Sequence, residues 1–419
     1  MIMPLQDKFH VVVIGGGASG LMAAGRAAEC GASVLLLERM DRLGLKLLIS
    51  GKGRCNLTNS GETENFLANF SRTGNFLRPA FHRFFNTDLM KFFESRGLDL
   101  KVERGGRIFP ETDQAHSVLH VFQQYLDKYG VKSRLNTRVR TIETEKGRVC
   151  GVTLSDESFV QAERIILATG GMSYPGTGSS GDGYKMARKL GHLIQPLKAA
   201  LVPLVVKENY VRDLMGLSLK NVKATVFSSG KAAASEFGEM LFTHFGLSGP
   251  IILSLSSTIL DLLEETPEVV VSIDLKPALS PEKLHARIIR ETNTFGRKSL
   301  KNYLPELLPS KIIPIFLYLL GTAPEKKLNH LERAERERLV FLLKDFRLTV
   351  NSSRPIEEAI VTRGGISVRE IDPRTMESKK TRGLYLCGEV IDVDARTGGY
   401  NLQTAFSTGF LAGESAAKN

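Results

Sequence analysis

The chain has 419 residues, of which 42% are hydrophobic and 24% are charged, and its formal net charge is +11. This length and composition predict two or three packed units and exclude long disorder, and the most apolar run, residues 312–320, is too short to span a membrane. Basic residues are interleaved with acids, which argues against a nucleic-acid partner, and no export signal is recognisable, so we expect a cytoplasmic protein.

The first forty residues have the pattern of a β-α-β unit. Apolar runs over residues 9–14 and 33–37 predict two strands, and residues 18–30 have the spacing of a helix. The second strand ends in an acid, Glu38, which is placed to accept hydrogen bonds from the ribose hydroxyls of an adenosine. We therefore expect a nucleotide-binding domain to begin here.

The turn between the first strand and the helix has the sequence G-x-G-x-x-G. Gly15 permits a tight turn, Gly17 lets the backbone approach a pyrophosphate, and Gly20 lets the helix pack closely on the strand. The phosphates would lie at the helix N-terminus, where free N–H groups attract anions. This turn alone serves NAD as well as FAD. The residues of the turn that we expect to bind the cofactor are Gly15, Gly17, Ala18, Ser19 and Gly20.

A second G-x-G-x-x-G lies at residues 176–181. Residues 172–175 separate it from the preceding strand, and the segment 192–197 beyond its helix does not end in an acid. We therefore expect no separate NAD(P)H domain here and predict a loop close to the flavin.

The middle of the chain differs from its two ends in its pattern of predicted strands and helices. Residues 195–277 contain strand-like runs, residues 278–351 contain amphipathic helices punctuated by proline, and strand, turn and helix patterns then return. We predict an α/β fold in which a nucleotide-binding domain is built from residues 1–194 and 352–419. Residues 195–351 would form an inserted domain.

The loop at residues 44–59 is basic and rich in glycine. Its two lysines, one arginine and three glycines could surround an anion with cations and backbone donors. An ordinary exposed basic loop has the same composition, so the residues alone leave both interpretations open.

Four segments give the chain a resemblance to a known family: residues 50–59, 106–110 and 242–250, and the C-terminal run that includes 398–405. In them the chain resembles the bacterial flavoprotein family that includes aminoacetone oxidases and a 3-dehydro-bile acid reductase. It is more distantly similar to the fumarate reductase flavoproteins. The resemblance implies FAD and a two-part Rossmann-like domain interrupted by a β-barrel-like and helical insertion.

The resemblance also implies which residues hold FAD. Glu38 and Arg39 would lie at the adenosine end, the backbone of Val139 at the adenine, and the basic loop along the pyrophosphate and flavin. A helix that starts after Gly398 would turn its N–H groups toward the flavin, stabilising the reduced ring by about 0.3–2 kcal/mol. The cofactor residues implied beyond the glycine turn are Glu38, Arg39, Lys46, Gly53, Arg54, Asn56, Val139, Ala168, Thr169, Gly170, Gly388, Glu389, Gly399, Asn401 and Leu402.

The candidate catalytic residue is His244. It lies in a loop of the inserted part that is punctuated by glycine and proline, and a histidine exchanges protons near neutral pH. A structural role is the alternative. Cys55, beside the flavin, would either tune the flavin or pack in the core. The cysteines and histidines have no metal-ligand spacing, so no metal site is expected.

These features predict an FAD-dependent oxidoreductase that exchanges hydride between the flavin and a small organic substrate bound between the two domains. We favour a reductase supplied by NAD(P)H. An oxidase of a small amine or aminoketone that uses oxygen stays open, because the sequence has no convincing second dinucleotide site. An RNA-handling flavoprotein with partly structural FAD is the alternative that draws on the +11 charge.

Overall fold

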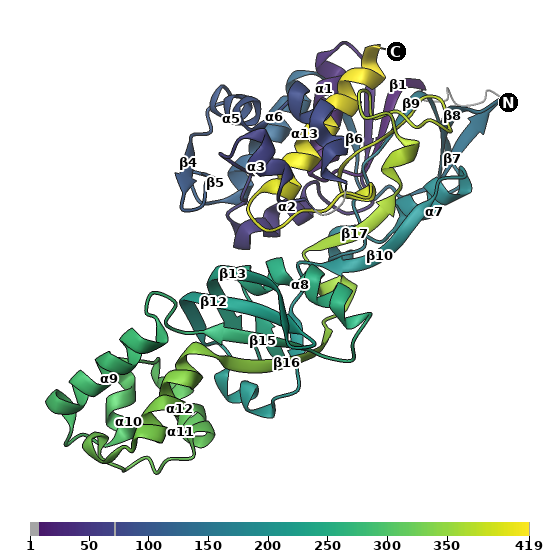
Figure 1. Cartoon of the computed structure of the whole chain (residues 1–419). Coiled ribbons are helices and arrows are strands. Elements are labelled where there is room, and N and C mark those ends of the chain that lie inside the picture. Colours follow the sequence, from purple (N-terminus) through teal and green to yellow (C-terminus); the bar gives the residue numbers. More distant parts are fainter. Residues whose placement is uncertain (1–7, 71–72, 419) are drawn as a thin grey trace. The chain divides into compact units, whose positions relative to one another are not determined.

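The computed structural model describes residues 8–70 and 73–418, which form two compact units (Figure 1). Unit 1 joins both ends of the chain, up to Ala200 and from Ile356 onward, and unit 2 is Leu201–Pro355. Both boundaries between the units lie a few residues beyond those predicted from the sequence. The first lies after β10 (Ile194–Ala200) because this strand pairs antiparallel with β17 (Val361–Ile366) of unit 1. The second lies after β16 (Phe346–Ser353) because Ser352 and Ser353 still pair with β11 (Leu204–Val206) of the barrel in unit 2.

The main sheet of unit 1 has seven strands in the order β6-β2-β1-β9-β8-β7, with β18 also beside β9. The first four of these strands and β18 pair in parallel, whereas β8 and β7 pair antiparallel. Strand β1 is buried from Val11 to Ile14, as expected for a parallel strand covered on both faces. The α/β Rossmann-like fold predicted from the sequence is therefore confirmed. The strand bounds are β1 Lys8–Ile14, β2 Val34–Leu37, β6 Lys132–Arg134, β7 Val139–Glu145, β8 Arg148–Leu154, β9 Phe159–Leu167 and β18 Leu384–Leu386.

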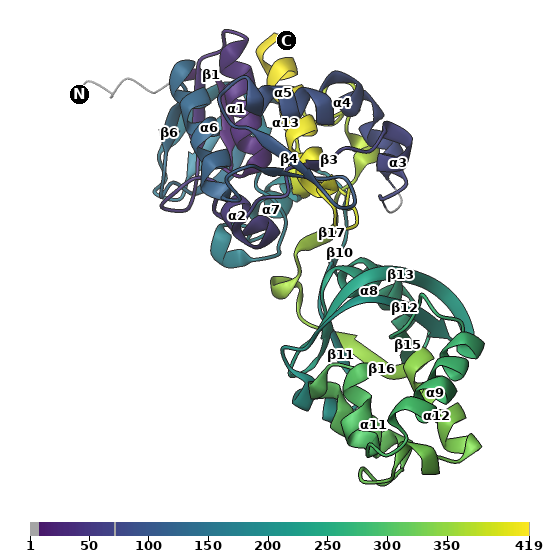
Figure 2. The ribbon, with the colours of Figure 1, turned by 90° about the vertical axis from the view of Figure 1, so that its left-hand side faces the viewer.

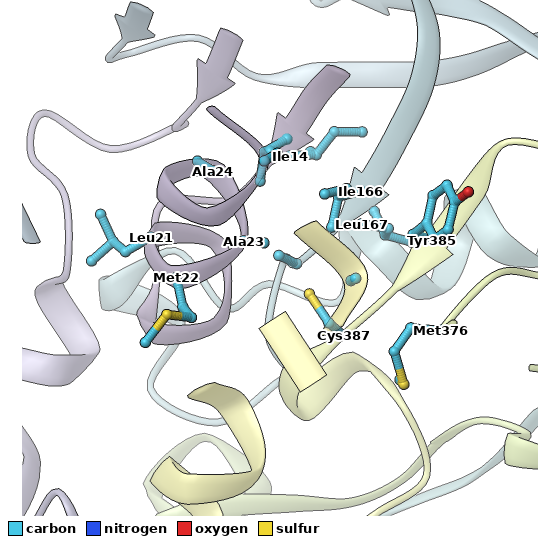
Figure 3. Packing of buried hydrophobic residues seen from close by; sticks show 14 of the residues in the cluster. Ile14, Leu21, Met22, Ala23, Ala24, Ile166, Leu167, Met376, Tyr385 and Cys387 are labelled. Carbon is cyan, nitrogen blue, oxygen red and sulfur yellow. The ribbon is translucent and has the colours of Figure 1, made fainter. Parts of the chain in front are cut away.

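Helices α1 (Ala18–Glu29) and α13 (Tyr400–Lys418) lie in close contact beside this sheet (Figure 1). A Cβ atom at Gly409 of α13 would lie 2.4 Å from the Ser19 carbonyl oxygen, and one at Gly413 would lie 2.3 Å from another backbone oxygen of α1. Only glycine permits this approach. Figure 3 shows the buried side chains that pack around α1. This contact fixes the C-terminal helix against the helix that begins at the glycine turn.

A buried carboxylate, Glu414, joins α13 to α1 and to α4 (Arg78–Arg83). It accepts hydrogen bonds from Arg26 Nη2 and from Arg83 Nε, each at 2.5 Å. The Arg83 bond holds the pKa of Glu414 well below its usual range, and Arg26 adds to this effect although burial opposes it. The cluster therefore requires an ionised Glu414.

Glu414→Gln is expected to lower the free energy of unfolding by about 2 kcal/mol at neutral pH, because two guanidinium groups lose a charged acceptor. The folded protein lowers the pKa of Glu414, so this contribution is present above the unfolded pKa of about 4.3 and is lost as the pH falls. Urea unfolding of both proteins, repeated from about pH 7 down to about pH 3, measures the shrinking difference. Glu64→Gln, which removes a solvent-exposed partner of Arg78, should change nothing measurable. An equal loss in both variants would contradict the assignment.

The remaining elements of unit 1 cover the main sheet or form small sheets. Helix α6 packs on α1, and β3, β5 and β4 form a three-stranded antiparallel sheet. Their bounds are α2 Leu45–Ile49, α3 Thr63–Leu67, α5 Asn86–Glu94, α6 Ala115–Lys128, α7 Asp182–Lys189, β3 Thr58–Asn59, β4 Leu100–Glu103 and β5 Arg107–Pro110.

Unit 2 is a closed antiparallel barrel with the strand order β11-β14-β13-β12-β15-β16 (Figure 2). Helix α8 (Pro250–Leu263) packs on β13, and four more helices lie between β15 and β16 in the chain. The predicted barrel-like and helical insertion is thus confirmed. None of the helices in the described residues of either unit is long and apolar enough to cross a membrane. The remaining bounds are β11 Leu204–Val206, β12 Ser218–Ser228, β13 Lys231–Phe242, β14 Gly246–Ser248, β15 Val269–Asp274, β16 Phe346–Ser353, α9 Pro281–Phe295, α10 Leu300–Tyr303, α11 Ile313–Leu320 and α12 Arg333–Lys344.

Candidate functional site

A cavity in unit 1 lies where β1, β2 and β9 end and α1 begins. Parallel sheets of this kind bind nucleotides at the carboxyl ends of their strands. Most residues predicted to hold FAD line this cavity. They are Gly15, Gly17, Ala18, Ser19, Glu38, Arg39, Lys46, Val139, Ala168, Thr169, Gly170, Gly388, Glu389, Asn401 and Leu402.

The glycine turn leaves open space at the start of α1. Gly17 is the N-cap residue, no side chain caps the helix, and a Cβ atom built on Gly17 would meet nothing within 4 Å. Gly15 has a φ of +105°, which favours glycine, and a Cβ atom on Gly20 would lie 1.8 Å from the Gly15 carbonyl oxygen. The first N–H groups of α1 have no acceptor within the helix, so the open space beside Gly17 suits an anionic group.

Glu38 at the end of β2 is buried and holds the glycine turn in place. Its Oε2 accepts a hydrogen bond from the Gly16 N–H at 2.7 Å, and its Oε1 accepts one from the Met40 N–H at 2.8 Å. A carboxylate has about four acceptor positions, so two remain for the ribose hydroxyls predicted from the sequence. The acid therefore combines a structural role with the predicted binding role.

The second glycine motif lies against the residues assigned to the adenosine end. A Cβ atom on Gly178 would lie 3.4 Å from Glu38 Oε1, and Arg39 donates hydrogen bonds to Ser180 and, at 3.1 Å, to Asp182. The sequence predicts no separate NAD(P)H domain here and a loop close to the flavin. The loop lines the cavity beside Glu38, at the predicted adenosine end. The hydrogen bonds of Arg39, which no local pattern shows, are the physical reason.

Asp182, the first residue of α7, joins two arginines at this end of the cavity. It accepts two hydrogen bonds from Arg138, at 2.8 and 2.9 Å, as well as the bond from Arg39. Burial would raise the pKa of Asp182, but Arg138 and Arg39 lower it. Two arginines are thereby held at the cavity wall with their charge only partly neutralised, where they can attract a phosphate.

An ion pair crosses the other end of the cavity. Lys46 Nζ donates to Glu389 Oε2 at 2.7 Å and to Ser173 Oγ at 2.6 Å. Glu389 Oε1 in turn accepts a hydrogen bond from the Thr362 N–H at 2.8 Å. Both side chains are partly exposed, so they can exchange these bonds for bonds to a ligand. Gly388, with a φ of +76°, brings this strand end against α1, since a Cβ atom there would lie 2.3 Å from Ser19 Oγ.

The start of α13 completes this end of the cavity. The Asn401 side chain accepts a hydrogen bond from the Ala395 N–H and donates one to the Ala395 carbonyl oxygen, both at 2.9 Å. The amide thus folds the loop before the helix, and Leu402 and Thr404 reach the cavity wall. The cavity fits FAD: it offers an uncapped helix start for the pyrophosphate, a buried acid for the ribose, and a second helix start for the ring.

Several predicted cofactor residues lie outside the cavity lining, namely Gly20, Gly53, Arg54, Asn56 and Gly399. Arg54 is held by Asp113 at 2.7 Å and by Glu103, and its guanidinium stacks over Phe109. The Asn56 amide, oriented to satisfy its neighbours, accepts the Gly399 N–H at 3.0 Å and donates to Thr58. These residues shape the loops around the cavity, and their contact with FAD stays a prediction.

Other lining residues are not among those predicted from the sequence. Ile360 and Val361 reach the cavity because β17 pairs with β10, and Arg42 and Ser50 reach it from the loops around α2. Arg138 could have been found, because it directly precedes Val139 and is basic.

The two candidates for proton or thiol chemistry differ in their surroundings. His244 lies in unit 2, exposed in the turn between β13 and β14, with its ring 4.9 Å from that of Phe245. Its catalytic role stays a prediction. Cys55 is fully buried in unit 1, and burial raises the pKa of its thiol to about 12. Cys55 is therefore a neutral packing residue at pH 7, without the thiolate that a covalent role would require.

The chain is similar to known proteins over nearly its whole length. The model of the HI0933-like protein Rossmann domain matches residues 9–415. The chain is 35% identical to the 3-dehydro-bile acid delta(4,6)-reductase of Clostridium scindens, over 98% of this chain and 99% of the relative. It is 32% identical to the ribosomal RNA dihydrouridine synthase of Escherichia coli, over 97% and 98%. The fold also resembles that of E. coli quinol fumarate reductase, with a TM-score of 0.53, 18% identity, and coverage of 98% and 70%.

Proposed function

The chain belongs to the HI0933-like Rossmann-domain family and is an FAD-dependent oxidoreductase, and from this premise we propose that it is a reductase of carbon–carbon double bonds conjugated with a carbonyl group. The names of two nearly full-length relatives support this proposal. A delta(4,6)-reductase of a 3-oxo steroid acid and an enzyme that forms dihydrouridine both saturate a double bond of that kind. The shared bond, rather than either whole substrate, is the common element.

Residues of the cavity, and His244 of unit 2, would have different roles in such a reaction. FAD, when bound, supplies the hydride chemistry. The start of α1 would bind its phosphates, and Glu38 and Arg39 would hold the adenosine, with Glu38 at the ribose. The start of α13 would stabilise negative charge at the ring, and Lys46 and Glu389 would orient the chain between them. We assign the proton that completes the reduction to His244.

A small organic substrate is the first candidate, with NAD(P)H as the electron donor. A uracil base within RNA is the second, because a relative of nearly the same length is named as a ribosomal RNA dihydrouridine synthase. Both candidates require the same bond to be reduced, so one experiment compares them.

The test uses the purified protein under anaerobic conditions. NADH or NADPH is expected to bleach the flavin, and photoreduced protein is then mixed separately with a 3-oxo-4,6-diene steroid acid, a uridine-containing RNA transcript, or air. Reoxidation by a conjugated double bond should be at least about tenfold faster than reoxidation by air, which corresponds to an activation barrier lower by about 1.4 kcal/mol. Rapid reoxidation by air with no reaction toward nicotinamides, or bleaching of the oxidised flavin by an aminoketone, would contradict the reductase assignment and show that the protein is an oxidase.

A further inference from the structure

The positive charge of unit 2 is concentrated in its helical part. Residues 276–344 contain 14 Lys and Arg but seven Asp and Glu, a net charge of +7. The barrel part, residues 201–275 and 345–355, contains seven Lys and Arg and ten acids, a net charge of −3. The interleaving noted along the sequence therefore hides a separation of charge within one folded unit.

Helix α9 presents this charge as a stripe. Lys283 and Arg290 lie seven residues apart, and Arg297 follows after seven more, just past the end of the helix. Seven residues are nearly two helical turns, so Lys283 and Arg290 share one face of α9 about 10 Å apart, and Arg297 continues the series beyond the helix end. Ala286 and Asn293, on the same face, are exposed and uncharged. We call Lys283, Arg290 and Arg297 the basic stripe.

The basic stripe is not neutralised by neighbouring acids. Across the described residues of the chain, no acidic side chain forms an ion pair with any of its three members. Glu291, the nearest acid in sequence to Arg290, is occupied by Arg287 at 2.8 Å and by the Tyr303 hydroxyl at 2.6 Å. The three exposed charges thus remain available to a polyanion.

Further cations meet the stripe at the end of α9. The Asn329 N–H donates to the Gly296 carbonyl oxygen at 3.1 Å, and a β-bridge joins Ser299 to Lys327. These contacts place exposed Lys327 beside Arg297 and Lys298. Lys298 is paired with Glu306 at 3.5 Å, so the stripe ends beside one further cation, Lys327, that forms no ion pair with a described acid.

An exposed aromatic ring lies near the same turn. Lys301 lines an open groove with Pro305, Pro314 and Tyr318, and the Tyr318 side chain is 77% exposed. An exposed aromatic ring near cations can stack with an unpaired nucleic-acid base. A nucleic-acid duplex or a lipid headgroup would interact mainly with the cations. Cations at regular spacing together with a stacking ring favour a single-stranded or looped RNA over an acidic protein or a lipid surface.

We propose that the basic stripe of α9 and the neighbouring Tyr318 groove form a docking surface for looped RNA. Lys283, Arg290 and Arg297 contact successive parts of the phosphate backbone, and Tyr318 stacks with an unpaired base. The proposal rests on the reductase function only for its consequence, that a docked RNA can present a uracil. RNA binding itself requires no reduction, so its failure and the failure of the proposed reaction are distinguishable.

The test measures binding of the FAD-loaded full chain to a labelled 40-nucleotide RNA stem-loop at several salt concentrations. The variant K283E/R290E/R297E is expected to bind at least about 30-fold more weakly, and the slope of log K against log salt should fall by about 2 to 3, as the loss of three phosphate contacts predicts. The matched control K220E/K223E/K231E makes the same change of charge at exposed positions of β12 and β13. It should lose less than about threefold.

A second pair of variants tests the groove. Tyr318→Ala should weaken binding of the same RNA about tenfold, and Tyr318→Phe, which keeps the ring, should not. Equal losses in the two triple variants would show a general effect of charge and overturn the proposal. Binding to vesicles containing 30% phosphatidylglycerol without binding to the RNA would overturn it in favour of a lipid surface. Flavin content and circular dichroism, unchanged in every variant, would exclude misfolding.

Discussion

Gly17→Val is expected to abolish the retention of FAD while the protein stays folded. The backbone of Gly17 has φ −80° and ψ −172°, which any residue adopts, and its Cβ position meets no protein atom within 4 Å. A valine side chain would therefore enter the open space predicted to hold the pyrophosphate, without a clash inside the protein. We expect the Kd for FAD to rise at least about 100-fold, or about 2.7 kcal/mol. Titration of the apoprotein with FAD, followed by flavin fluorescence, measures this change.

Two matched variants separate blocked binding from a damaged helix. Alanine and valine are similarly poor N-cap residues, costing about 1 kcal/mol of helix stability, so Gly17→Ala controls for capping. It should weaken FAD binding by less than about tenfold. Gly20→Ala should instead destabilise the apoprotein, because its Cβ atom would lie 1.8 Å from the Gly15 carbonyl oxygen. Equal loss of FAD in Gly17→Ala and Gly17→Val would show that the side-chain volume is not what excludes the cofactor.

The cofactor-binding turn could be predicted because its function depends on neighbours in the sequence. Gly15 and Gly17 lie between β1 and α1, Gly20 lies in the first turn of α1, and Glu38 directly follows β2. Each requirement, a positive φ, an open Cβ position or a close backbone contact, concerns residues that the β-α-β unit brings together by itself. The structure therefore has the geometry that the local pattern predicts.

The parts that sequence reasoning missed depend on contacts between distant residues. Ile360 reaches the cavity only because β17 pairs with β10, more than 150 residues earlier in the chain. Arg54 has the residue type of an anion-binding group, yet Glu103 and Asp113, separated from it by 49 and 59 residues, hold its guanidinium. No local pattern contains this information. The concentration of positive charge in the helical part of unit 2 was hidden for a related reason, since most acids interleaved with its cations in sequence, such as Glu291, Glu335 and Glu337, form ion pairs in the structure.

His244→Ala is expected to retain FAD and to lose the reduction of the conjugated double bond. His244 lies in unit 2, whereas every residue lining the FAD cavity belongs to unit 1, so its removal leaves cofactor binding untouched. It is exposed at the turn between β13 and β14, so the loss of its ring leaves no cavity in the barrel core. If His244 donates the proton, the rate at which the substrate oxidises the photoreduced variant should be about 10²- to 10⁴-fold lower, which is the usual rate contribution of general acid catalysis. Stopped-flow absorbance of the flavin measures this rate directly.

Three comparisons distinguish a proton donor from a residue that merely shapes the turn. His244→Gln keeps a polar side chain of similar length but cannot exchange a proton in the same way, so it should be as slow as the alanine variant. Imidazole added to His244→Ala should restore part of the rate, because it supplies the missing acid without repairing the turn. His82→Ala, at an exposed position of α4, should have no effect. A fast glutamine variant would make His244 a positioning residue, and an unchanged rate in the alanine variant would remove it from the reaction altogether.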